Sequence, residues 1–265
     1  MTPPRSFDWD AILDRLSAFY HRGDWRVPYL RDHAENPFQV LVGTILSQRT
    51  RDENTARASA RLFAKYPGPR ELATAPPATL EKLIHSTGYY RTKARHIRAT
   101  SQAILDRFGG QVPADRDLLL TLPGVGPKTA NCVLVFGYGL PAVPVDTHVH
   151  RIANRLGLVR TRTPEQTERE IVRRVPPQYW IPLNPVLVQH GQNICRPNGP
   201  RCDECPIRDL CATGIALRDG RRPPRKEDRL GSKRIRVRRS VKTARLRSPR
   251  SAGTAAGRRR ATEGF

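Results

Sequence analysis

The sequence of 265 residues lacks long apolar runs, and no segment approaches the roughly 20 apolar residues that cross a bilayer. Residues 1–9 also lack the charged and then apolar layout of a signal peptide. These absences argue against a membrane protein and against a secreted one. We therefore expect an intracellular protein of the cytoplasm or nucleoid, with no membrane partner.

Acidic residues and cysteines are also few. The chain has 24 Asp and Glu against 47 Lys and Arg, which gives a formal net charge of +23 and a pI of about 11.1. A chain this basic usually meets a polyanion, and nucleic acid is the leading candidate. Four of the five cysteines fall within Cys195–Cys211, which is not the pattern of a secreted disulfide framework.

The basic residues are concentrated towards the C-terminus. Residues 221–265 hold 17 Lys and Arg against three acids, while the rest of the chain still carries a net charge of +9. After residue 214 apolar residues are scarce, so this segment cannot bury enough surface to offset its ordering entropy. We predict a disordered basic tail over 214–265 that adds salt-sensitive affinity for DNA.

Apolar residues at helical spacing dominate the rest of the chain, and no alternating strand pattern of useful length is present. Asp8 is placed to cap the first helix, and Asn36 and Pro37 are placed to start the second. We therefore predict an all-α fold. The expected helices are 8–20, 38–47, 55–66, 77–85, 93–108, 116–121, 128–137, 147–156, 164–175 and 184–193.

A glycine-containing turn, LPGVGPKTA at residues 122–130, separates two of the expected helices. Gly124 and Gly126 permit a sharp turn and a close backbone approach. The N–H groups that open the next helix can then hold a phosphate without reading sequence. A plain connector between helices would also use such a turn, but the basic composition favours nucleic-acid binding.

Lys128 follows this turn, and Asp146 comes eighteen residues later in the segment VDTH at 145–148. An amine near its usual pKa of about 10.4 is a poor nucleophile, but burial and a helix N-terminus would both lower that pKa. An amine and a carboxylate beside a phosphate-binding loop are the parts of an enzyme that forms a Schiff base on nucleic acid. The simpler alternatives are a phosphate contact for Lys128 and a helix N-cap for Asp146.

The cysteine cluster has the spacing Cys-x6-Cys-x2-Cys-x5-Cys, formed by Cys195, Cys202, Cys205 and Cys211. Four thiolates in so short a span can surround one compact centre. Zinc is an alternative occupant, although zinc sites more often show two Cys-x2-Cys pairs and only one is present here. Cys132 lies on the apolar face of the helix after the turn, and we expect it in the core.

In these motifs the chain resembles the endonuclease III family of helix-hairpin-helix DNA glycosylase/AP lyases. The matching parts are LPGVGPKTA at 122–130, VDTH at 145–148 and the four cysteines, and the resemblance runs from about residue 10 to about 213. It implies a two-lobed helix-hairpin-helix DNA glycosylase fold. It also implies a [4Fe–4S] cluster on a C-terminal loop, with the four cysteines as ligands.

The order of the expected helices fits a division of the chain into three parts. The central lobe would be 36–146 and contain the helix-hairpin-helix, while a second lobe would combine 1–35 with 147–213 and carry the cluster loop. The basic tail over 214–265 would follow.

The resemblance further implies a bifunctional DNA N-glycosylase and AP lyase of base excision repair, which removes oxidised pyrimidines from duplex DNA. Lys128 would attack C1′ of an extruded nucleotide and form the Schiff base, and β-elimination would then cut the strand. Asp146 would stabilise positive charge or move protons, and His148 would touch a phosphate, orient that aspartate or be merely structural. The partner would be double-stranded DNA with a damaged base or an abasic site, bound by a monomer.

Two loops, 46–52 and 87–93, resemble the family's DNA-inserting loops. Much of the family has a glutamine one residue after Gln48, where Arg49 stands here, so either side chain could face the orphaned base. Tyr89 takes the place of an apolar wedge, and its ring can stack between bases. A solvated helix end for Gln48 and Arg49, and surface packing for Tyr89, are the simpler alternatives.

Two other functions stay open. One is a mismatch or uracil DNA glycosylase on the same scaffold, although the related adenine and thymine mismatch glycosylases lack the lysine found here as Lys128. The other is a non-catalytic DNA-damage-binding protein, which would need no pairing of Lys128 with Asp146.

Overall fold

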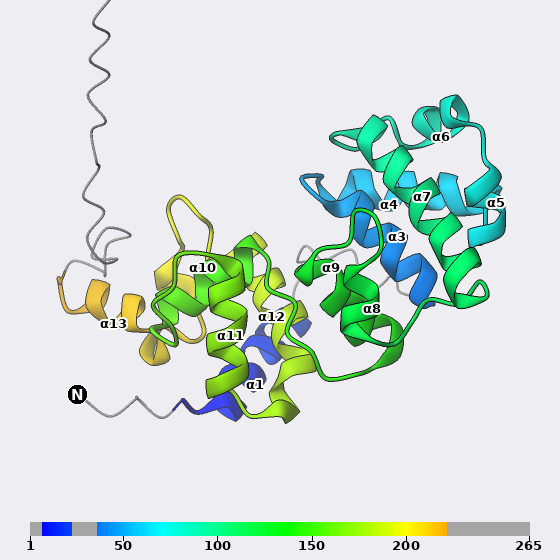
Figure 1. Ribbon diagram of the computed structural model, residues 1–265. Coiled ribbons are helices and arrows are strands. Elements are labelled where there is room, and N and C mark those ends of the chain that lie inside the picture. The colour runs from blue at the N-terminus through cyan, green and yellow to red at the C-terminus, as the bar shows by residue number, and fades with distance from the viewer. Residues whose placement is uncertain (1–6, 23–35, 222–265) are drawn as a thin grey trace, which may run out of the picture. The chain divides into compact units, whose positions relative to one another are not determined.

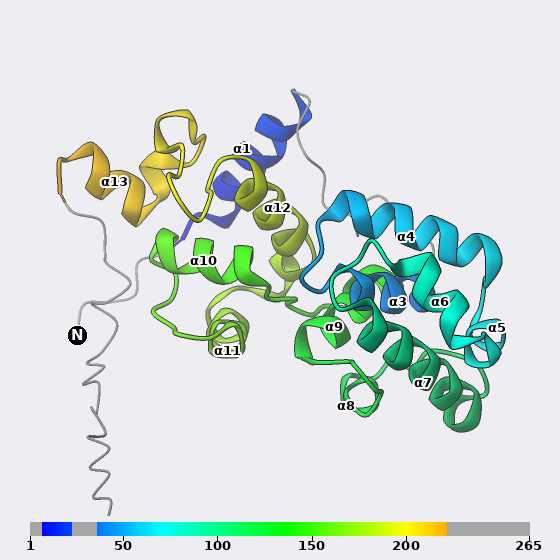
Figure 2. The ribbon, with the colours of Figure 1, turned by 90° about the horizontal axis from the view of Figure 1, so that it is seen from above.

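The computed structural model describes residues 7–22 and 36–221, and every regular element in these ranges is a helix, so the predicted all-α fold is confirmed (Figures 1 and 2). None of these helices is long and apolar enough to span a membrane. The first eight are α1 (Trp9–His21), α3 (Pro37–Ser47), α4 (Asp52–Lys65), α5 (Pro69–Thr74), α6 (Pro77–Ile84), α7 (Tyr90–Phe108), α8 (Arg116–Leu120) and α9 (Pro127–Cys132). The others are the π-helical turn η1 (Val133–Gly137), α10 (Thr147–Leu156), α11 (Pro164–Arg174), the 3₁₀ turn η2 (Pro177–Tyr179), α12 (Trp180–Asn193), the 3₁₀ turns η3 (Cys202–Glu204) and η4 (Arg208–Leu210), and α13 (Ala212–Arg218).

Side-chain caps set several helix starts. The Asp8 carboxylate accepts the N–H of Ala11 at 2.9 Å at the start of α1, and the Asn36 side chain accepts the N–H of Gln39 at 2.9 Å at the start of α3. Pro37 occupies the first position of α3, where its missing N–H costs nothing. Both predicted starts are therefore confirmed.

The first core forms around α3, whose buried residues cover almost its whole circumference. Val40, Leu41, Val42 and Ile45 are each at most 1% exposed, as expected for a helix that is apolar all round. The helices α4, α7 and α9 and the turn η1 pack against α3, and both views show α3 among them (Figures 1 and 2). The hairpin after α8 is thus anchored to a buried helix.

The second core joins α1 to α10, α11 and α12, which lie far from it in the sequence. Leu16, Val149, Ile171 and Leu187 are each at most 1% exposed within it. These two clusters of buried residues support the division into 36–146 and 1–35 plus 147–213, which we keep as a proposal. Residues 1–6 and 23–35 lie outside the described residues.

The structure corrects the sequence analysis at the start of the tail. Residues 214–218 belong to α13, where Gly214 and Ala216 are buried and Thr213 Oγ1 donates to the Arg155 carbonyl at 2.8 Å. The prediction of disorder from residue 214 is therefore wrong for these residues, because a short buried face holds them on α10. Residues 222–265 of the predicted tail lie outside the described residues.

Three further differences concern helices. The short helix α5 was not predicted, and α12 begins at Trp180 rather than at residue 184 because Pro182 and Pro185 are tolerated near its start. The helix expected over 128–137 changes at Cys132 from α to π geometry. Such π turns are rare and often lie at functional sites.

Candidate functional site

The segment LPGVGPKTA forms a tight turn between α8 and α9. Gly124 has a φ of +77°, and a Cβ at this position would lie 2.6 Å from the ring of His96, so that only glycine fits. The turn is also held from behind, because Thr100 Oγ1 donates to the Pro123 carbonyl at 2.5 Å. The structure therefore contains the predicted helix-hairpin-helix.

Gly126 has a different role from Gly124. It is the N-cap of α9, and a Cβ built on it would meet nothing within 4 Å. The surrounding fold thus leaves room for a side chain at Gly126, and its bare backbone opens the start of α9 to a group from outside the chain. The first N–H groups of a helix have no partner within it, which suits them to an anion.

Lys128 is the second residue of α9, and its side chain is partly buried. Burial lowers the pKa of its amine, whereas the Cys132 sulfur and the carboxylates of Asp146 and Asp52 raise that pKa, and it stands above its usual value. Burial also raises the pKa of the Cys132 thiol. At neutral pH the two carboxylates therefore keep the lysine protonated, and our expectation of a lowered pKa is wrong for the protein alone.

Cys132 lies one turn after Lys128 and is 1% exposed, so its predicted place in the core is confirmed. It is more than a packing residue, because its sulfur is hydrogen-bonded to the Lys128 amine and to Thr44. The same helix thus supplies both the amine and one of its polar neighbours.

Asp146 is the N-cap of α10. Its Oδ1 accepts the N–H groups of His148 and Val149, each at 2.8 Å, so the N-cap interpretation is confirmed. No hydrogen bond from a described residue reaches its second oxygen, and its charge acts on the Lys128 amine. One carboxylate therefore starts a helix and faces the lysine. His148 Nδ1 lies 3.1 Å from the Arg151 guanidinium, and its contact with a phosphate stays a prediction.

The two predicted inserting loops lie side by side. The Gln48 amide donates to the Gly124 carbonyl at 3.3 Å and to Thr129 Oγ1 at 3.4 Å, which turns it towards the hairpin. Arg49 instead reaches the other loop, where its guanidinium donates to the Tyr89 hydroxyl at 3.2 Å and lies 5.5 Å from the ring centroid. The two candidates for the orphaned base thus have different surroundings.

Lys93 joins these loops, and the sequence analysis gave it no role. Its ammonium donates to the carbonyls of Leu46 and Gln48 and to Thr50 Oγ1, at 2.6, 2.7 and 2.8 Å. Burial lowers the pKa of Lys93 to about 8, and these acceptors favour the charged form. A signal was present, because Lys93 falls on the buried stripe of α7 together with Ile97.

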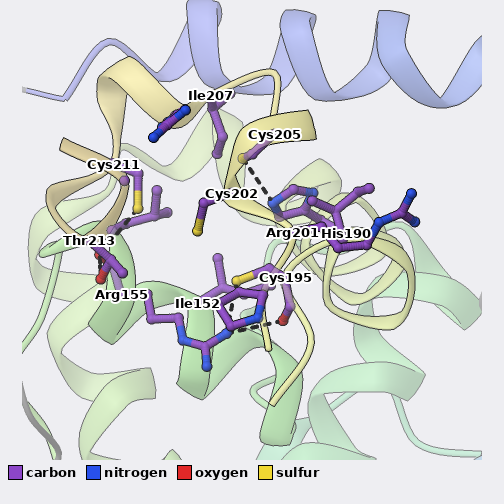
Figure 3. Close-up of a pocket in the computed structure, with 15 residues that line it drawn as sticks. Ile152, Arg155, His190, Cys195, Arg201, Cys202, Cys205, Ile207, Cys211 and Thr213 are labelled. Atoms are coloured by element: carbon purple, nitrogen blue, oxygen red, sulfur yellow. Dashed lines mark hydrogen bonds between the residues drawn. The ribbon is translucent and has the colours of Figure 1, made fainter. Parts of the chain in front are cut away.

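The four cysteines surround one space between η3, η4 and the end of α12, and Figure 3 shows their sulfur atoms around it. Ile152, Leu156 and Ile207 also line this pocket. Burial raises the pKa of the Cys202, Cys205 and Cys211 thiols. Thiolates in this pocket therefore need a positive centre to offset their burial.

The sulfur positions bear on which centre the pocket could hold. Four sulfurs around one zinc ion would lie roughly 3.8 Å apart, because each Zn–S bond is about 2.3 Å. In the described part of the chain, no group of three or more Cys, His, Asp and Glu is close enough to hold a single metal ion. Four cysteines around one pocket are a ligand set that iron–sulfur clusters use and that zinc can also use.

Two further contacts around this pocket were not predicted. His190 Nε2 lies 3.6 Å from Cys205 Sγ (Figure 3). Its Nδ1 lies 2.8 Å from the Tyr20 hydroxyl. Arg155 of α10 donates to the Arg196 and Pro197 carbonyls, at 2.6 and 2.9 Å. Asp146 is the N-cap of α10, so this one helix connects the lysine–carboxylate pair with the cysteine loop.

Asp52, from a segment far away in the sequence, also acts on the Lys128 amine. The Gln192 amide donates to Asp52 Oδ2 at 2.8 Å, which joins the start of α4 to α12. Asp52 is the last residue of the 46–52 loop, and no local sequence pattern predicts that it acts on Lys128. Its proximity follows from the packing of helices that lie far apart in the chain.

Comparisons with known proteins agree with this geometry. Residues 42–177 match the model of the HhH-GPD superfamily of base excision DNA repair proteins. Endonuclease III of Thermotoga maritima is 51% identical over 182 residues, which cover 68% of this chain and 85% of that protein.

Two solved structures are similar at 33% identity. The structure of a non-covalent endonuclease III–DNA complex has a TM-score of 0.71 and covers 81% of this chain and all of its own. A trapped endonuclease III–DNA covalent intermediate has a TM-score of 0.70 and covers 80% of this chain and all of its own. The chain therefore belongs to the endonuclease III family, the DNA glycosylase/AP lyases of the HhH-GPD superfamily of base excision DNA repair proteins.

Proposed function

We propose that the protein removes oxidised pyrimidines from duplex DNA and then cuts the strand at the abasic site, with Lys128 as the nucleophile. The observation that carries the proposal is the shared environment of Lys128 and Asp146, in which the carboxylate acts on the amine and starts α10. Because both residues come from one chain, a monomer is sufficient.

The chemistry begins with the protonated lysine. Lys128 must lose its proton before it attacks C1′, and Asp146 or the departing base can accept it. The new C1′–N bond forms as the glycosidic bond breaks, and the base leaves with a proton. Asp146 stabilises the positive charge that develops on the sugar. The bonded nitrogen then opens the sugar ring: the C1′–O4′ bond breaks, O4′ takes a proton, and C1′ and the nitrogen form the Schiff base. Loss of a C2′ proton from the Schiff base breaks the C3′–O bond by β-elimination, and hydrolysis frees the lysine.

DNA is held at the hairpin and opened by the two loops in this proposal. The start of α9 at Gly126 holds a phosphate, and His148, in the first turn of α10, contacts the DNA backbone. The damaged nucleotide leaves the stack, as base chemistry in a duplex requires. The similarity to a protein solved in complex with DNA supports DNA as the partner, and we propose that the protein acts at the nucleoid.

We further propose that the four cysteines hold a [4Fe–4S] cluster. Cys195, Cys202, Cys205 and Cys211 offer the thiolate set that such clusters use, and all four line one pocket. The cluster supplies the positive centre that keeps the loop 195–211 folded. No step on the DNA passes through it.

Borohydride trapping tests the proposed nucleophile. The wild type should give a covalent adduct with an oxidised-pyrimidine duplex, whereas Lys128→Ala should give none. Lys82→Ala, which changes an exposed lysine of α6, is the matched control and should trap like the wild type. The same assay with duplexes that carry a uracil or a mismatch tests the alternative substrates. An undiminished adduct in Lys128→Ala would show that the nucleophile lies elsewhere.

A further inference from the structure

The backbone conformation of the two loops is unusual at one residue in each. Arg49 has a φ of +51° and Tyr89 a φ of +57°, and in the described ranges they are the only residues other than glycine with a positive φ. Side-chain-bearing residues rarely adopt this conformation, and such residues cluster at functional sites. These two residues contact each other.

Arg49 and Tyr89 form one stacked unit that projects from the surface. The guanidinium lies over the ring and donates to the hydroxyl, and Tyr89 is 65% exposed, an unusual fraction for a large aromatic side chain. The cation–π contact and the hydrogen bond together restrain the position of the guanidinium. Arg has five such donors, and the Tyr89 hydroxyl accepts from one nitrogen.

Hydrogen bonds beneath this unit fix both loops. Lys93 is 3% exposed, and its three donors are used by three acceptors of the first loop. Thr50 Oγ1 accepts from Lys93 and also from the Gly88 N–H of the second loop, at 3.1 Å. The positions of Arg49 and Tyr89 therefore depend on one buried ammonium. Gln48, by contrast, is already bonded to the hairpin.

We propose that Arg49 contacts the base left unpaired in the opposite strand and selects guanine over adenine, and that Lys93 is the residue that positions it. The inference rests on the proposed function, since only an enzyme that extrudes a nucleotide leaves such a base. Guanine offers two neighbouring acceptors, O6 and N7, that match the paired donors of a guanidinium. Adenine has an amino group where guanine has O6, and this hydrogen-bond donor repels the donors of the guanidinium.

The test is binding rather than turnover. Each variant is titrated with duplexes that carry a tetrahydrofuran abasic analogue opposite guanine or adenine, at one fixed salt concentration. The wild type should bind the guanine duplex about tenfold more tightly, the value of one good bidentate contact. Arg49→Gln should lose or invert this preference, because glutamine pairs with adenine N6 and N7. Gln48→Ala should keep it.

Lys93→Met separates positioning from general stability. A merely structural role would weaken binding to both duplexes by the same factor, whereas a positioning role reduces the guanine-to-adenine ratio itself. Lys82→Met is the matched control for loss of a lysine charge. Equal affinities in the wild type, or loss of the preference in Gln48→Ala rather than in Arg49→Gln, would overturn the inference.

Turnover in the same samples tests the proposed function separately. A guanine preference without release of an oxidised base would leave the assignment of Arg49 intact and contradict the proposed activity. Release of the base without any guanine preference would support the proposed activity and contradict the assignment of Arg49.

Discussion

Lys128 is protonated in the resting protein, and this charge decides how the site responds to pH. Asp146 and Asp52 hold the proton on an amine that burial alone would make easier to deprotonate. A raised pKa means that the reactive amine is scarce at neutral pH and becomes more abundant as pH rises. Single-turnover base release should therefore accelerate with pH until the lysine is neutral.

The substitution Cys132→Val should alter this pH dependence while it leaves the proposed reacting groups, Lys128 and Asp146, in place. The hydrogen bond from the Cys132 sulfur favours the charged lysine, and valine fills a similar buried volume. We expect the rising limb of the pH–rate profile to move to lower pH, with Asp146 unaltered. A profile that stays in place, or moves to higher pH, would contradict the role given to this thiol.

The two hairpin glycines should respond differently to alanine. Gly124→Ala should lower the free energy of unfolding by at least about 1–2 kcal/mol, because it forces a left-handed side chain against His96. Gly126→Ala should cost less stability but weaken DNA binding about tenfold, the loss of one hydrogen bond to a charged group. Denaturant titration and DNA titration of both proteins check this. Equal losses of DNA affinity in the correctly folded variants would contradict it.

At the scale of elements, α10 is the connection between the proposed chemistry and the cysteine loop. Asp146 starts it, and Arg155 near its end contacts Cys195 Sγ at 3.3 Å and three carbonyls of the 195–197 segment. Arg155→Met should lower the free energy of unfolding by about 2 kcal/mol and, in the protein loaded with the proposed cluster, speed the loss of visible absorbance to a chelator. Arg160→Met, at an exposed position, is the control. Unchanged bleaching would show that the loop is held by its ligands alone.

The local elements were predictable where the residues themselves enforce the boundary. The bounds of α10 follow from the Asp146 cap and from Gly157, which ends the helix with a φ of +82°. The hairpin was predictable for the same reason, since only glycine fits at Gly124. The start of α12 was not, because prolines near a helix start resemble breakers in a sequence.

Contacts between distant segments were the part that the sequence did not predict. The pKa of Lys128 was expected to fall because of its place at the start of its own helix, but Asp52, which raises that pKa, comes from α4, far away in the sequence. Lys93 lies on an apolar stripe, where a lysine has no local partner, and its three acceptors belong to another loop. Tertiary packing decides such charges.

At the scale of the whole molecule, the positive charge comes both from the C-terminal tail and from the rest of the chain. The tail from residue 221 holds 17 Lys and Arg, and the remainder of the chain is also basic. A chain ending near residue 220 should lose most affinity at low salt, about 100-fold at 50 mM, and little above 300 mM, because fewer counterions are released. Its cutting rate at saturating protein should be unchanged. Loss of cutting at saturation would show that the tail does more than attract DNA.

The double use of Asp146 has a consequence for anyone who needs a stable, inert form of this protein. An asparagine caps a helix about as well as an aspartate, so Asp146→Asn preserves the start of α10 while it removes the negative charge beside Lys128. Alanine would remove both at once and mix misfolding with inactivity. The asparagine variant is therefore the form to mix with damaged duplex for crystallisation, since it should dock like the parent and stall before the base leaves.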